Sequence, residues 1–134
     1  RTNFIGLKTT HATPSDAVNE IHQRLDNLSQ PFSLTVLGLG EDGHIASLFP
    51  GMSSNDQDTT QHCVAIDQPI APSPRMSLSL TTLAHSQHIA LVVVGRTKRL
   101  LLDRLSKQPN PQIPLVWLLQ RCQTPATIFE TDTV

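Results

Sequence analysis

Two side chains that can exchange protons stand close together in residues 38–51, a segment that we call the glycine-rich loop. Asp42 and His44 flank Gly43, so a turn at this glycine can bring the carboxylate beside the imidazole. An imidazole changes its charge near neutral pH, which makes it the commonest general base. The pair predicts acid/base chemistry, with His44 drawing a proton from water and Asp42 orienting or polarising it.

Glycines occupy positions Gly38, Gly40 and Gly43 of the loop. Glycine accepts positive φ and lets backbone amides approach a bound oxygen, so we expect these amides to hold an anion or a developing oxyanion. A Gly-x-Gly turn after a strand can also serve chain reversal alone, and such a glycine-rich turn is by itself a weak signal for a binding site. A purely structural turn therefore stays open as an alternative.

The loop follows a predicted strand. The apolar run at residues 34–37 stops at Gly38, as in a buried central strand that ends in a functional turn. Before this strand, a cap at Thr13 and apolar residues at helical spacing as far as Leu28 predict a helix that packs on a sheet. After the loop, residues 53–61 are polar and predict an exposed connection.

The remaining elements are expected as strands at residues 63–66, 76–81, 89–94 and 126–129, as helices at 98–107 and 116–119, and as a short helix or turn at 82–87. The strand at 89–94 is continuously apolar and is expected to be fully buried. In the strand at 76–81, the alternation predicts that Met76 and Leu78 face the core while Ser77 faces outward.

This order of elements predicts an α/β fold, with a mainly parallel, Rossmann-like sheet and helices on both faces. Ligands of such sheets collect at the carboxyl ends of the strands, where the glycine-rich loop lies. The 134 residues fit a single domain, 1–134. Because the chain begins at Arg1 rather than Met, we expect it to be a fragment of a longer protein.

Composition excludes several partners. The net charge is −1 with scattered Lys and Arg, and no apolar run could cross a bilayer, so we expect a cytoplasmic protein that binds neither nucleic acid nor membrane. Cys63 and Cys122 are expected to be reduced structural thiols. His85 and His88 do not make a convincing metal motif, so neither a metal nor an organic cofactor is expected. A small soluble substrate fits best.

The glycine-rich loop as a whole resembles a known signature. Residues 38–51 agree with the pattern Gly-x-Gly-x-Asp-Gly-His-x-Ala-Ser-Leu-Phe-Pro-Gly of the 6-phosphogluconolactonases at every fixed position. The resemblance extends to the preceding helix and strand, to the Pro74–Arg75 pair, and to residues 95–98. It points to the superfamily of glucosamine-6-phosphate isomerases and 6-phosphogluconolactonases, and it implies that residues 1–134 are the carboxyl-terminal part of a longer lactonase domain.

This resemblance implies hydrolysis of 6-phospho-D-glucono-1,5-lactone to 6-phospho-D-gluconate, in the oxidative branch of the pentose phosphate pathway. His44 matches the family's general base, and Asp42 would orient it. Lys98 matches the family's lysine and would meet the phosphate, with Arg75 as a second candidate for the phosphate or other substrate oxygens. Ser47 is expected to cap a helix that begins in the loop.

Two other functions remain open. Related amino-sugar-phosphate isomerases and deaminases share the start of the loop but continue with a Phe-Asn-Glu-Pro type of run, whose Glu takes part in proton transfer; this chain has Phe49 instead of a carboxylate. The other alternative is a non-catalytic phosphosugar-binding fragment, because the family's upstream phosphate loop and Asp-Glu-Arg motif do not occur before Thr13. That alternative predicts an exposed apolar sheet face. The oligomeric state is not indicated.

Overall fold

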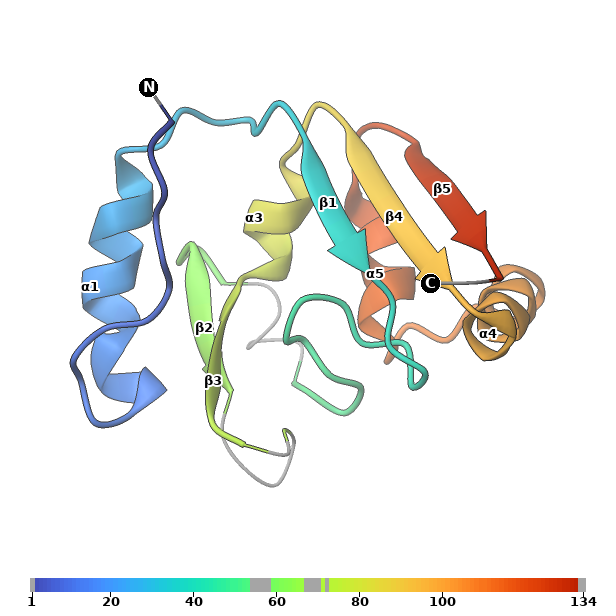
Figure 1. Ribbon diagram of the computed structural model, residues 1–134, viewed down its shortest axis with the longest axis horizontal. Helices are drawn as coiled ribbons and strands as arrows, with labels where there is room; N and C mark the ends of the chain where they lie inside the picture. Colours follow the sequence, from blue (N-terminus) through green and yellow to red (C-terminus); the bar gives the residue numbers. More distant parts are fainter. Residues whose placement is uncertain (1, 54–58, 67–70, 72, 133–134) are drawn as a thin grey trace.

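The computed structural model describes residues 2–53, 59–66, 71 and 73–132. Its elements are α1 (Pro14–Asp26), β1 (Thr35–Gly38), β2 (Cys63–Ile66), β3 (Arg75–Leu78), α3 (Leu80–Ala84), β4 (Ile89–Val94), α4 (Arg96–Lys107), α5 (Pro114–Arg121) and β5 (Ala126–Thr131). A parallel three-stranded sheet has the order β1-β4-β5, and β2 and β3 form an antiparallel pair (Figure 1). The predicted α/β class with a parallel sheet is confirmed. Most of the connection expected at residues 53–61 lies outside the described residues.

Helix α1 begins where the sequence predicts it. The Thr13 hydroxyl accepts a hydrogen bond from the Asp16 N–H at 3.2 Å, which satisfies one of the free amides of the first turn. The buried side of the helix carries Ile21 and Leu25, which pack with Cys63 of β2. The helix therefore covers the β2-β3 pair rather than the parallel sheet (Figure 1).

Strand β4 is the centre of the parallel sheet, because it pairs with β1 on one side and β5 on the other. Leu91 and Val93 point into the core with α3 and α5, whereas Val92 on the opposite face is 36% exposed. Val36 of β1 is 62% exposed on that same open face. Within the described residues, β1 pairs only with β4 and one sheet face is open, so the predictions of a central strand at 34–37 and a fully buried strand at 89–94 are wrong for this part of the chain.

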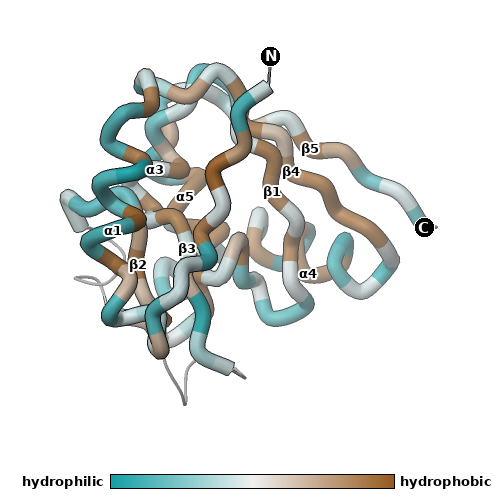
Figure 2. The backbone as a smooth tube through the Cα atoms, turned by 60° about the vertical axis from the view of Figure 1, so that its left-hand side comes forward, coloured by the Kyte–Doolittle hydropathy of each residue, from teal (hydrophilic) through white to brown (hydrophobic). Residues whose placement is uncertain are grey.

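The open face is apolar. It carries Val36, Val92 and Phe129, and Leu34 beside the start of β1 is also exposed. Figure 2 shows hydrophobic colouring along both β1 and β4. The exposed apolar sheet face expected for the fragment alternative is thus present in the described residues.

Strand β3 is covered on both sides. Met76 and Leu78 pack against the cluster of α1 and β2, as predicted for the inner face. Ser77 points the other way but is only 2% exposed, and its Oγ accepts a hydrogen bond from the Ser47 N–H at 3.2 Å. The prediction that Ser77 faces outward is wrong because the glycine-rich loop packs over that side of the strand.

The carboxyl ends of β1 and β4 lie next to each other. Gly38 at the end of β1 is paired with Val92 of β4, and the two strands run in the same direction. The glycine-rich loop leaves the first strand, and Gly95 leaves the second with φ of +93°, a conformation that favours glycine. Helix α4 starts directly afterwards, so its amino terminus and the loop share one edge of the sheet (Figure 1).

Two leucines, one in the core and one beside the open face of the sheet, test whether this face is uncovered. Leu91→Ala should lower the free energy of unfolding by about 2–5 kcal/mol, because it leaves a cavity in the core beneath the central strand. Leu34→Ala should change it by less than about 0.5 kcal/mol, because Leu34 is 57% exposed. Urea unfolding of both variants measures the difference, and equal losses would contradict the open face.

Candidate active site

The centre of the site is a short contact between neighbouring side chains. Asp42 Oδ1 lies 2.6 Å from His44 Nδ1 and also accepts the His44 backbone N–H at 3.0 Å. An ionised carboxylate only accepts, so the imidazole proton of this pair belongs on Nδ1. Nε2 then carries the free lone pair, which is the atom that a general base needs.

The charge of Asp42 follows from the same contact. Partial burial raises the pKa of Asp42, but hydrogen bonds from the His44 N–H and imidazole, with Coulombic attraction to that ring, hold the net pKa below its ordinary value. Asp42 is therefore a carboxylate at neutral pH. The predicted pairing of Asp42 with His44 is present in the structure.

Gly40 makes room for the imidazole. A Cβ built at this position would lie 2.1 Å from His44 Nδ1, far inside van der Waals contact. The Gly40 N–H donates to the His44 carbonyl oxygen at 2.9 Å, so the two residues are also tied through the backbone. Any larger residue at position 40 would push the ring away from Asp42.

The three glycines have different roles from those predicted. Of the three, only Gly43 has positive φ, at +93°, and its missing Cβ leaves space for Ile113, which would otherwise lie at 2.5 Å. The amides of Gly40 and Gly43 both donate inside the loop, so neither is free to hold an anion as expected. A Cβ at Gly38 would meet nothing within 4 Å, which leaves its surface open to a ligand.

A cavity of about 630 Å³ joins the loop to the edge of the sheet. Its described lining residues are Gly38, Leu39, Gly40, Glu41, His44, Ala46, Val92, Val94 and Lys98, and we call it the His44 cavity. Lys98 is the third residue of α4, so its ammonium stands at a helix amino terminus, where negative charge is favoured. The structure thus brings His44 and Lys98 to one cavity, because His44 follows β1 and Lys98 follows β4, and the carboxyl ends of these two strands are adjacent.

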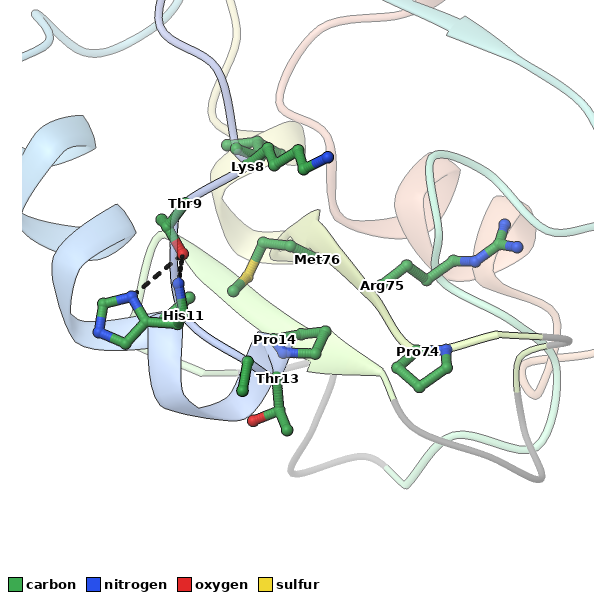
Figure 3. Close-up of a pocket in the computed structure, with 11 residues that line it drawn as sticks. Lys8, Thr9, His11, Thr13, Pro14, Pro74, Arg75 and Met76 are labelled. Atoms are coloured by element: carbon green, nitrogen blue, oxygen red, sulfur yellow. Dashed lines mark hydrogen bonds between the residues drawn. The ribbon is translucent and has the colours of Figure 1, made fainter.

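Arg75 does not line this cavity. Its guanidinium donates to the carbonyl and hydroxyl oxygens of Ser73, and its Cζ lies 5.7 Å from the centre of the Phe49 ring. Figure 3 shows Arg75 beside a second cavity, near Lys8 and His11, with its side chain extending away from His11. That second cavity is about 400 Å³, and we call it the Arg75 cavity.

Ser47 does not cap a helix. It lies in a tight turn in which the N–H of Leu48 donates to the Ile45 carbonyl oxygen at 2.9 Å, and the reverse bond is 3.3 Å. Within the described residues no helix begins in the loop, so the capping prediction is wrong. The preceding Ala46 has φ of +51°, a strained value for a residue with a Cβ, and it lines the His44 cavity.

One contact at the site was not predicted from the sequence. The Phe49 ring lies 4.7 Å from the His44 ring, centre to centre, with the planes tilted by 33°. Phe49 is 7% exposed, so it looks like an ordinary core residue. Its position at the end of the loop signature was the available signal.

The remaining reactive groups lie elsewhere. Cys63 and Cys122 are free, and burial raises the pKa of both thiols, so both stay protonated at neutral pH. No group of three or more His, Cys, Asp or Glu among the described residues could hold a metal ion. None of the described helices is long and apolar enough to cross a membrane.

The fold and the site together define an α/β protein with an acid/base pair and a cation at the carboxyl ends of a parallel sheet. Residues 1–128 match the family described as glucosamine-6-phosphate isomerases/6-phosphogluconolactonase, and the chain belongs to this family. The resemblance of the glycine-rich loop is thereby confirmed.

Named relatives agree with this assignment. The chain is 43% identical over 95 residues to the GDH/6PGL endoplasmic bifunctional protein of Oryctolagus cuniculus, covering 69% of this chain and 12% of that protein. It is 37% identical over 101 residues to the 6-phosphogluconolactonase of Caulobacter vibrioides, covering 71% and 42%. The crystal structure of a 6-phosphogluconolactonase from Shewanella baltica superposes with a TM-score of 0.87 at 31% identity, covering 95% and 56%. The chain therefore spans about half of that structure and less of the two relatives.

Two glycine substitutions test how the imidazole is held. Gly40→Ala should displace the His44 ring from Asp42, because the new methyl group would occupy the space of Nδ1. Gly38→Ala is the matched control, since its methyl group would meet no neighbour. The imidazole signals of His44 in nuclear magnetic resonance spectra should change strongly in the first variant and little in the second. Unchanged signals in Gly40→Ala would contradict the geometry.

Proposed function

We propose that the protein to which these residues belong hydrolyses 6-phospho-D-glucono-1,5-lactone to 6-phospho-D-gluconate, in the oxidative branch of the pentose phosphate pathway. The observation that carries the proposal is that His44, oriented by Asp42, shares one cavity with Lys98. Family membership and the named 6-phosphogluconolactonases support the same substrate.

The reaction needs one group that first takes and then returns a proton. His44 Nε2 takes a proton from water while the water oxygen bonds to C1 of the lactone and the carbonyl electrons move onto their oxygen. The tetrahedral intermediate then collapses, the bond from C1 to the ring oxygen breaks, and His44 returns the proton to that oxygen. Asp42 keeps the proton on Nδ1 and stabilises the imidazolium between the two steps.

The phosphate defines the other end of the substrate. Lys98 offers a mobile positive charge, and the amino terminus of α4 adds its partial positive charge at the same place. Lys98 is the proposed phosphate ligand, and Gly38 and Gly40 line the same cavity as Lys98 and His44. Arg75 and Gly43 do not line this cavity; Arg75 contacts Phe49 and Gly43 leaves space for Ile113, so neither is proposed as a phosphate ligand.

The isomerase and deaminase chemistry of the same family is less well supported. Phe49 stands where that chemistry places a carboxylate for proton transfer, and here its ring packs against His44. An aromatic ring cannot move a proton between substrate carbons and oxygens. Hydrolysis needs a base that activates water, and His44 can supply it without a second proton-transfer carboxylate.

Substitution of the base is the first test of the proposal. His44→Ala should lower the rate of lactone hydrolysis above the spontaneous rate by about 10²- to 10⁴-fold, the usual contribution of a general base. His88→Ala is the matched control, because His88 is exposed and precedes β4 at the opposite end of the strand. A full rate in His44→Ala, or equal losses in both variants, would contradict the role of His44.

A lysine pair on α4 tests the phosphate site. Lys98→Ala should reduce kcat/KM for the phosphorylated lactone by about 10- to 100-fold, the value of a charge-assisted hydrogen bond, but leave unphosphorylated glucono-1,5-lactone unaffected. Lys107→Ala removes a lysine that is 70% exposed and paired with Asp103 at the far end of the helix, and should change neither rate. Equal effects of Lys98→Ala on both lactones would contradict phosphate binding.

A further inference from the structure

The Phe49 ring connects two charged or ionisable groups that come from different parts of the chain. On one side the ring contacts the His44 imidazole, at 4.7 Å between ring centres. The Arg75 guanidinium of β3 lies over the same ring, 5.7 Å from its centre. Phe49 itself is 7% exposed and belongs to the main core cluster, so its ring has a fixed place.

The imidazole needs such a support. Asp42 contacts Nδ1, and the Nδ1–Cε1 side of the ring occupies the space that a Cβ at Gly40 would take. The His44 side chain is nevertheless one third exposed and lines an open cavity, so among the described residues no protein group on the cavity side fixes the orientation of its ring plane. A rotation of the ring about its bond to Cβ would remove Nδ1 from Asp42 and turn Nε2 away from the substrate.

We propose that Phe49 is a positioning residue, whose ring fixes the plane of the His44 imidazole so that Nε2 faces the His44 cavity. Arg75 holds the Phe49 ring from β3 through a cation–π contact. An aromatic ring suits this role because ring pairs have preferred offset or tilted geometries, whereas an aliphatic side chain of similar size leaves the imidazole free to turn. The inference rests on the proposed function only in assigning a catalytic purpose to Nε2.

The activity test separates positioning from binding. Phe49→Leu should lower kcat for the phosphorylated lactone by about 10- to 100-fold, because a small misplacement of a catalytic group is this costly. KM should stay nearly constant, since Lys98 is untouched. Phe49→Tyr keeps the ring and should restore most of kcat. Leu80→Ala, which removes a buried side chain of α3, is the control for lost stability and should retain kcat.

A spectroscopic test does not depend on turnover. In the folded wild-type chain, the ¹⁵N shifts of His44 should report a proton on Nδ1 and a free Nε2. In Phe49→Leu they should report a mixture of the two tautomers at the same pH, and in Phe49→Tyr the wild-type state. Leu80→Ala should leave the tautomer unchanged.

The two readouts separate failure of the inference from failure of the proposed function. A mixed tautomer in Phe49→Leu supports the inference even if the wild-type chain shows no lactone hydrolysis, which would overturn the function alone. An unchanged tautomer in Phe49→Leu overturns the inference. A wild-type kcat in Phe49→Leu, with activity lost in His44→Ala, also overturns it and leaves the function intact.

Discussion

The hydrogen bond between Asp42 and His44 is the interaction on which the site depends. At 2.6 Å it fixes the tautomer of the imidazole, and the ring in turn helps to keep the carboxylate charged. The bond can form only because Gly40 has no side chain where the ring lies and because Gly43 turns with φ of +93°. The sequence predicted that the amides of Gly40 and Gly43 bind an anion. In the structure, both glycines serve mainly by leaving space, Gly40 for the His44 ring and Gly43 for Ile113.

The parallel pairing of β1 with β4 extends this local contact into a site. It places the glycine-rich loop beside the start of α4, so residues more than fifty positions apart in the sequence face one cavity. Strand β3 supports the loop from the other side, through Ser77 Oγ at the Ser47 N–H and through Arg75 over Phe49. Arg75 and Ser77 lie two positions apart and so point to the same face of β3, whereas Met76 faces α1.

Local patterns in the sequence were sufficient for most of the elements and for the residues of the loop. The strand expected at 76–81 is an exception: it ends at Leu78, because Ser79 caps helix α3 by accepting a hydrogen bond from the Thr82 N–H. The cap at Thr13, the parallel strand ending at Gly38 and the pairing of Asp42 with His44 follow from spacing and chemistry alone. Burial was harder to predict: Val36 looks like a core residue, and only the strand order shows that β1 is at an edge. The Phe49 contacts could not be predicted, because an aromatic residue in a loop has no periodicity to reveal its neighbours.

The most direct test of a shared site is a titration with 6-phosphogluconate, the product of the proposed reaction, followed by nuclear magnetic resonance. We expect the imidazole signals of His44 and the signals of Lys98 to shift together along one saturation curve, because both residues line the His44 cavity. Shifts confined to Lys8, His11 and Met76 would place the ligand in the Arg75 cavity instead. That result, or the absence of any shift at His44, would contradict the account.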